Sequence, residues 1–144
     1  MAPECAFCRL AEAAAEAVFQ DAETVAFLDH RPVFPGHTLL VPRAHHETLA
    51  DLPPDLIEPV FRSVQLLSRA VEQAMAADGT FVAINNKVSQ SVPHLHVHIV
   101  PRKKKDGLRG FFWPRQKYES DEQRREVAER IRDAAERLQT PGPR

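Results

Sequence analysis

The stretch His94-Leu95-His96-Val97-His98-Ile99-Val100 alternates three histidines with apolar residues. Alternate side chains of a β-strand share a face, so the three imidazoles are predicted to project together at intervals of roughly 7 Å, with the apolar residues facing a core. A single histidine in a strand is usually packed or solvated, whereas three in strict alternation indicate a chemical site. The segment predicts a strand over 95–101 that carries a catalytic or metal-binding row.

Short strands and two substantial helices are expected around this segment. Apolar residues at three- and four-residue spacing predict a long helix over 55–77, and Ser120 with Gln123 predicts the capped start of a helix over 121–139. Local patterns predict the remaining elements: a short helix over 5–15, a hairpin of 17–19 and 25–28, and strands over 38–41 and 80–85. The order predicts an α+β fold, an antiparallel β-sheet with one long central helix and a C-terminal helix.

Length and composition favour one globular domain. The chain has 144 residues, 43% of them hydrophobic and 27% charged, with a formal net charge of -1. We expect no nucleic-acid partner, because there is no overall charge excess, and no membrane partner, because the apolar runs are too short to cross a bilayer. Charged residues interrupt the N-terminus, which argues against a signal peptide and makes a cytoplasmic location the expectation.

Two chemical uses of the three histidines stay open at this point. They can ligate a metal, or one can act as a nucleophile while its neighbours fix its tautomer and stabilise developing charge. The residues upstream favour the nucleophile. Gln90 and Ser91 supply neutral hydrogen-bond donors for a phosphate, and no Asp or Glu that would complete a hydrolytic metal site occurs between Asp78 and Asp106.

The wider pattern resembles the histidine triad (HIT) family. The alternating histidines match its signature, and similarity covers roughly residues 5–105 through three further segments: Phe27-Leu28-Asp29, residues 35–43 (Pro-Gly-His-Thr-Leu-Leu-Val-Pro-Arg) and Gln90-Ser91-Val92. The resemblance implies a HIT-like fold over residues 1–110, with 111–144 as a C-terminal extension of the same domain. It also implies a nucleotide hydrolase or transferase that cleaves at the α-phosphate of nucleoside phosphoramidates or dinucleoside polyphosphates through a nucleotidyl-histidine intermediate.

The resemblance assigns roles residue by residue. His96 would be the nucleophile, with His94, His98 and Ser91 completing the catalytic set and Ser91 relaying a proton toward the leaving group. Asp29 would bind the ribose hydroxyls of a nucleotide, a purine nucleotide by preference. The other nucleotide-binding residues would be His30, Asn85 (or its neighbour Asn86), Gln90, Ser91 and His98.

The paired cysteines fit a subset of the family that holds a structural zinc ion. The resemblance implies a closed tetrahedral site of Cys5, Cys8, His45 and His94, with His46 as a competing ligand beside His45. By itself the CxxC spacing fits reduced surface thiols equally well.

Two other functions remain alternatives: a catalytically weak nucleotide-binding or signalling adaptor, and a zinc-dependent hydrolase that uses all three histidines as ligands. The resemblance also implies a homodimer paired through the long helix and an adjacent strand edge. The aromatic cluster Phe111-Phe112-Trp113 is expected near that interface or the pocket. The basic residues around it are expected to form a solvated loop over the active site.

Overall fold

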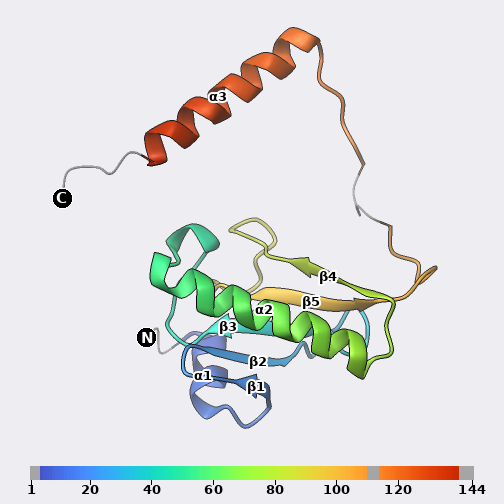
Figure 1. Cartoon of the computed structure of the whole chain (residues 1–144). Helices are drawn as coiled ribbons and strands as arrows, with labels where there is room; N and C mark the ends of the chain where they lie inside the picture. Colours follow the sequence, from blue (N-terminus) through green and yellow to red (C-terminus); the bar gives the residue numbers. More distant parts are fainter. Residues whose placement is uncertain (1–3, 110–113, 140–144) are drawn as a thin grey trace, which may run out of the picture. The chain divides into compact units, whose positions relative to one another are not determined.

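The computed structural model describes residues 4–109 and 114–139, which fall into two compact units, Met1–Asp106 and Gly107–Arg144. In the first unit the helices are α1 (Ala6–Ala13), α2 (Pro54–Ala74) and the short 3₁₀ helix η1 (Leu49–Asp51). Its strands are β1 (Ala17–Gln20), β2 (Thr24–Leu28), β3 (Thr38–Pro42), β4 (Gly79–Ala83) and β5 (Val97–Arg102) (Figure 1). The predicted α+β class is confirmed.

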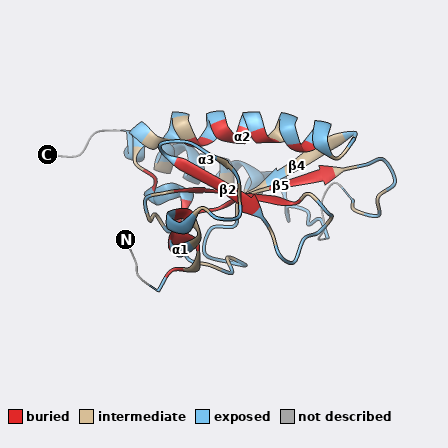
Figure 2. Cartoon of the chain, turned by 90° about the horizontal axis from the view of Figure 1, so that it is seen from below, coloured by how far each residue is buried: buried red, intermediate tan, exposed pale blue. Residues whose placement is uncertain are grey.

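The strands form one antiparallel sheet in the order β1-β2-β3-β5-β4. Helix α2 covers one face and turns its buried side toward the strands, while α1 lies against the other face (Figure 2). Alternation along β2 and β3 explains this arrangement. Ala26 and Leu40 pack under α2, whereas Val25 and Phe27 pack under α1.

Helix α2 packs on the sheet through one apolar stripe. Val60, Val64, Leu67 and Val71 are buried at three- and four-residue spacing, and they meet apolar side chains from β5 and from the segment just before it. Leu95, Val97 and Ile99 are those side chains, each fully buried. The apolar half of the histidine segment therefore faces α2, which leaves its other half to the α1 side.

The strand that carries the histidines is shorter than predicted. It begins at Val97 rather than Leu95, so His94 and His96 precede it. Pro93 has no N–H, and the Leu95 N–H donates to the carbonyl of the distant His46, 2.7 Å away, instead of joining the ladder. The three histidines thus do not form one row on a regular strand, and their rings are held by different partners.

Other boundaries shift by one to three residues. The long helix spans 54–74 instead of 55–77, since Ala76 adopts a left-handed φ of 48° just beyond its end. Strand β4 ends at Ala83, two residues early, and Pro42 belongs to β3, where it pairs with Thr24. The other helices and strands lie where the sequence predicts them.

The second unit consists mainly of helix α3 (Asp121–Gln139), which matches its predicted range and has no buried residue. Its cap is nearly the predicted one. The Ser120 hydroxyl accepts from the Gln123 N–H at 3.0 Å, but the Gln123 amide accepts from Glu119 rather than from Ser120. The predicted aromatic cluster at 111–113 lies outside the described residues. The extension as part of the same domain stays a prediction.

Across residues 4–109 and 114–139, every helix is too short or too polar to span a lipid bilayer.

Candidate active site and metal cluster

A cavity of about 250 Å³ opens on the α1 side of the sheet, next to the histidine segment. Five residues predicted from the sequence line it together: Asp29, His30, Ser91, His96 and His98. The rest of its wall is mainly apolar and aromatic, from Phe7, Leu10, Phe27, Leu28, Leu39 and Val92, with Arg31 at the polar end. Apolar walls with a few converging polar groups are typical of small-molecule sites, and a planar base would find an aromatic surface here.

His96 is held with one defined ring nitrogen free. It is only 3% exposed, and its Nδ1 lies 2.7 Å from the His94 carbonyl oxygen. A carbonyl can only accept, so Nδ1 carries the proton, and in the neutral ring Nε2 keeps its lone pair. The ring packs edge-on against Phe7, with centroids 4.9 Å apart, and lies 5.0 Å from His98. His96 therefore offers a nucleophilic nitrogen at the cavity.

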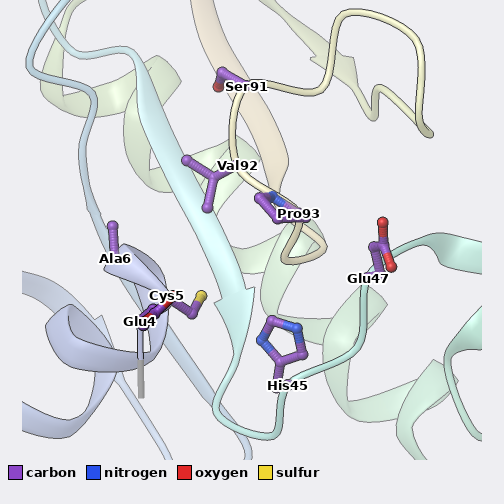
Figure 3. A pocket seen from close by; sticks show the side chains of 8 residues that line it. All are labelled: Glu4, Cys5, Ala6, His45, Glu47, Ser91, Val92 and Pro93. Carbon is purple, nitrogen blue, oxygen red and sulfur yellow. The ribbon is translucent and has the colours of Figure 1, made fainter. Parts of the chain in front are cut away.

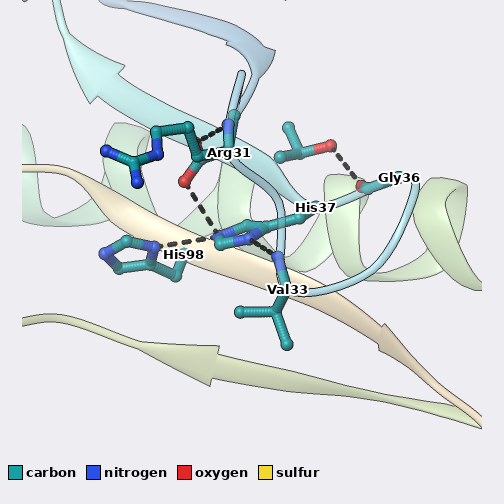
Figure 4. Close-up of polar contacts among 7 residues, drawn as sticks. Arg31, Val33, Gly36, His37 and His98 are labelled. Atoms are coloured by element: carbon teal, nitrogen blue, oxygen red, sulfur yellow. Dashed lines mark hydrogen bonds and ion pairs between the residues drawn. The ribbon is translucent and has the colours of Figure 1, made fainter.

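His98 is set in the opposite tautomer by a relay through His37 (Figure 4). The Val33 N–H donates to His37 Nδ1 at 3.1 Å, so the proton of neutral His37 lies on Nε2. That Nε2 donates to His98 Nδ1 at 2.9 Å, which leaves the His98 proton on its own Nε2. This last atom is buried and, within the described residues, has no hydrogen-bond partner. An orphan donor beside a cavity is suited to an anionic oxygen.

Burial keeps the rings of this relay neutral. Desolvation lowers the pKa of His98 to about 4, with the neighbouring His96 and His37 adding to the shift. Burial also lowers the pKa of His37, although Asp29 opposes the effect. Both histidines are consequently neutral near pH 7, as the tautomer assignment requires.

The sequence pattern assigns no role to His37, although this residue lies in the 35–43 segment that resembles the family. The signal that places His37 at the site is the β3–β5 register, in which Leu39 pairs with His98. Gly36 is needed beside it, because its φ is 99° and a Cβ there would approach Met75 to 2.6 Å. Only the sheet pairing brings His37 to the third histidine of the triad.

Asp29 lies at the polar end of the cavity with its side chain 23% exposed. One carboxylate oxygen accepts from the Arg31 N–H at 2.9 Å, and the other lies 3.7 Å from His37 Nε2. The carboxylate retains acceptor capacity for a hydroxyl pair. His30 is at the rim, 71% exposed, and its Nε2 lies 3.0 Å from the Glu16 carboxylate.

Two of the predicted phosphate ligands do not line the cavity. The Gln90 amide bridges two loops, since it accepts from the Lys87 N–H at 2.8 Å and donates to the Glu47 carbonyl at 2.6 Å. Asn86 accepts from the Leu49 N–H, while Asn85 is exposed beyond the end of β4. The Gln90 amide thus braces the loop that carries Ser91, which itself is exposed at the cavity wall.

A second hollow adjoins the first at Ser91 and Val92, which line both. It has a volume of about 590 Å³, and Figure 3 shows it between the start of α1, the 91–93 loop and the segment of His45 and Glu47. Among the described residues that line it, Glu4 and Glu47 are the two carboxylates and none is Lys or Arg. A group leaving the first cavity past Ser91 would enter an acidic surrounding.

The four predicted metal ligands, His94 among them, lie together in the structure. The ligand atoms of Cys5, Cys8, His45 and His94 all lie within 4.8 Å of one another, and three of the four residues are buried. His94 Nδ1 is 3.4 Å from both sulfurs, and His45 Nδ1 is 3.3 Å from Cys8 Sγ. His46 does not belong to the cluster.

The His94 ring presents the correct nitrogen for a metal. Its Nε2 donates to the Pro42 carbonyl at 2.8 Å, so Nδ1 carries the lone pair that faces the sulfurs. Burial lowers the pKa of His94 to about 4, which favours the neutral, ligating form. Two thiolates and two imidazoles at this spacing fit the closed tetrahedral coordination of structural zinc.

Solved structures with the same fold include two relevant bacterial proteins. The chain is similar to a member of the HIT family from Bacillus subtilis, with a TM-score of 0.79 and 31% identity over 90% of this chain and 96% of that one. A Zn-bound histidine triad family protein from Mycobacterium smegmatis gives a TM-score of 0.68 and 32% identity, over 92% and 97% of the two chains.

Sequence relatives point the same way. A HIT-like protein of Saccharolobus solfataricus is 37% identical over 90% of this chain and 94% of its own length. "Adenylylsulfatase HINT3" of Arabidopsis thaliana is 32% identical over 73% of this chain, which spans 55% of that protein. The model of the HIT domain matches residues 11–105. With the histidine segment, the cavity and the sheet in agreement, this chain belongs to the HIT domain family.

Proposed function

We propose that this chain is a nucleotide-binding hydrolase or transferase that cleaves at the α-phosphate of nucleoside phosphoramidates or dinucleoside polyphosphates. The observation that carries the proposal is the pair of fixed tautomers. His96 presents a lone pair on Nε2, and His98 presents a proton on Nε2, at the wall of one cavity. An attacking nitrogen beside a donor for phosphoryl oxygens is the minimum that transfer at phosphorus needs.

The reaction divides into two steps. His96 Nε2 attacks the α-phosphorus, a P–N(His) bond forms, and the bond from phosphorus to the leaving nitrogen or oxygen breaks. Ser91 stands between the two cavities: its hydroxyl gives a proton to an amine leaving group and regains one from solvent, and the amine departs on the Glu4 and Glu47 side. Water or another acceptor then attacks the phosphorus and loses its proton to solvent, the P–N(His) bond breaks, and the nucleotide leaves with the His96 Nε2 lone pair restored.

Binding in the first cavity follows from its two ends. The base, a purine by preference, rests against the aromatic wall of Phe7 and Phe27, and the Asp29 carboxylate accepts from the ribose hydroxyls. His30 extends the rim, while Gln90 acts through the loop that brings Ser91 to the phosphate. Asn85, which is exposed beyond the end of β4, stays a predicted nucleotide ligand.

The Cys5, Cys8, His45 and His94 cluster holds a structural zinc ion in this proposal. The ion would tie α1 to the segment before β5 and would supply folding stability rather than a water nucleophile, because four protein ligands leave no open position. A hydrolytic metal on all three histidines is disfavoured. Their nitrogens are engaged separately, with Pro42, with the His94 carbonyl and with His37.

A homodimer completes the proposal. Strand β4 is one of the two edge strands of the described sheet, and apolar side chains remain exposed on it and on α2. Val82 is 42% exposed, Ile57 47% and Phe61 40%. Pairing of two copies would cover them and extend the sheet. Light scattering at micromolar concentration should give twice the 16.2 kDa chain mass, and Phe61→Asp with Val82→Lys should give the monomer.

The function is tested with His96→Asn and His96→Gly. Turnover of an adenosine phosphoramidate and of a dinucleoside tetraphosphate should fall by at least about 10³-fold, because the nucleophile is gone, while nucleotide binding by calorimetry stays measurable. Acid-free trapping of wild-type protein should capture a nucleotide on His96. Binding without turnover in wild type would instead indicate the adaptor, and normal kcat in the His96 variants would refute the proposal.

A further inference from the structure

Phe7 stands between the two cysteines of the cluster and reaches the nucleophile. It lies on the first turn of α1, between Cys5 and Cys8 in sequence, and is 8% exposed. Its ring contacts three other rings: Phe27 at a centroid distance of 5.4 Å, His94 at 6.2 Å and His96 at 4.9 Å. A single side chain thus joins the cluster, the cavity wall and the reacting imidazole.

The His96 ring needs such a contact. Within residues 4–109 and 114–139 the ring makes one hydrogen bond, from Nδ1 to the His94 carbonyl at 2.7 Å, so it can still tilt about its Cγ–Nδ1 edge. Nε2 lies opposite that edge, so a tilt displaces the nucleophilic lone pair most. The Phe7 ring meets the His96 ring at 80°, an edge-to-face geometry that fixes the imidazole plane.

The contacts of the two cysteines on either side of Phe7 hold its backbone in place. Cys5 Sγ accepts from the Cys8 N–H at 3.4 Å, and both sulfurs lie 3.4 Å from His94 Nδ1. The first turn of α1 is therefore anchored to His94, the same residue whose carbonyl holds His96 Nδ1. The backbone of His94 and the ring of Phe7 both support the His96 imidazole, and both are anchored at the cysteine cluster.

We infer that Phe7 is a positioning residue for His96: its ring sets the plane of the imidazole, so that Nε2 faces the α-phosphorus. The inference rests on the proposed function only in taking His96 as the nucleophile. A wall residue that merely binds the base would affect KM, whereas a residue that aims the nucleophile affects kcat.

The experiment compares Phe7→Leu, Phe7→Tyr and Val25→Ala in the full chain. Val25→Ala is the matched control, since Val25 is fully buried in the same part of the hydrophobic core as Phe7 but does not line the cavity. Leucine keeps an apolar surface for the base beside Phe27, so Phe7→Leu should leave KM within about threefold. It should lower kcat on a phosphoramidate by about 10–100-fold, as a misaimed reacting atom does. Phe7→Tyr keeps the ring and should restore most of kcat.

A spectroscopic arm needs no turnover. In histidine-labelled protein, ¹⁵N NMR of wild type and Val25→Ala should show His96 as one sharp tautomer, protonated on Nδ1. Phe7→Leu should show that ring broadened or split, with metal per chain by elemental analysis equal to wild type. Together these results would support the inference.

Other outcomes overturn it. A changed KM at normal kcat would make Phe7 a wall residue only, and an equal kcat loss in Val25→Ala would make the effect one of packing. Loss of kcat in step with loss of metal would assign it to the cluster. If wild type turns over no nucleotide, the proposed function fails. The positioning role is judged separately by NMR, and a sharp single-tautomer His96 signal in Phe7→Leu would refute it.

Discussion

Replacing His37 with phenylalanine should impair catalysis without removing any group that touches the phosphate. In the wild-type chain, the Val33 N–H and His37 force the proton of His98 onto Nε2. Phenylalanine fills nearly the same buried space but cannot donate to His98 Nδ1. His98 is then free to carry its proton on Nδ1, where its Nε2 presents a lone pair to the phosphoryl oxygen instead of a donor.

The size of the effect has two bounds. The lost His37–His98 hydrogen bond has a net strength of about 0.5–1.5 kcal/mol, or about 2–10-fold in the tautomer ratio. Complete loss of an oxyanion donor costs about 10²–10³ in kcat. The structure favours a value between them, because the His98 Nε2 is buried with no alternative partner in residues 4–109 and 114–139. We expect kcat of His37→Phe to fall by about 10–100-fold.

The assay is steady-state turnover of an adenosine phosphoramidate with nucleotide affinity measured in parallel. His37→Gln is the matched variant, since its amide can still donate to His98 Nδ1 and should keep most of kcat. Both variants leave the Val33 N–H with a poorer partner, so both should lose about 1–3 kcal/mol of unfolding free energy. Equal kcat in His37→Phe and wild type, or equal losses in the Phe and Gln variants, would refute the relay.

Three further predictions concern metal, leaving group and pH. The double variant Cys5→Ser, Cys8→Ser should lose zinc by elemental analysis and melt several degrees lower, yet keep substantial activity below its melting point; a zinc-to-chain ratio near zero in wild type would contradict the site. Glu47→Lys should raise the ratio of kcat/KM for a dinucleoside tetraphosphate to kcat/KM for a phosphoramidate by about 3–10-fold, because it removes an acidic charge from the second hollow. The increase should be smaller at high salt. An unchanged ratio would mean that the leaving group departs elsewhere. The pKa of His98 is about 4 in the folded chain and has its ordinary value of 6.5 in the unfolded chain, so the unfolded chain binds the proton first as the pH falls. The contribution of neutral His98 to the free energy of unfolding is therefore present above pH 6.5 and is lost as the pH falls toward 4. Urea unfolding at pH 7 and pH 5 should show wild type losing about 1–2 kcal/mol more than His98→Gln, and equal losses would count against a buried neutral ring.

Much of the fold follows from local patterns in the sequence. The apolar stripe of α2 specifies a helix that buries one side, and the Ser120 hydroxyl marks the start of α3. The alternation of apolar residues at 95, 97 and 99 specifies which half of the histidine segment enters the core. These features depend on neighbours a few residues apart, and short-range rules are sufficient for them.

The same rules were wrong where distant backbone competes for a hydrogen bond. Alternation predicts that the strand begins at Leu95, but the Leu95 N–H donates to His46 and the ladder starts at Val97. Likewise Gln90 has the right chemistry for a phosphate, yet its amide is engaged with Lys87 and Glu47. No spacing in the sequence reveals that a donor is already occupied by a residue 43 positions away.

The sequence by itself determined the kind of chemistry: three imidazoles, a serine, a carboxylate and two thiols in an order that matches one family. The tertiary structure alone decided what each imidazole can do. Pro42 accepts from His94 Nε2, the His94 carbonyl accepts from His96 Nδ1, and His37 donates to His98 Nδ1. Three like residues therefore present a lone pair toward the cysteines, a lone pair on Nε2 and a proton on Nε2. The physical reason is that a neutral imidazole has one donor and one acceptor, and which nitrogen is which depends on the partner that folding brings within about 3 Å.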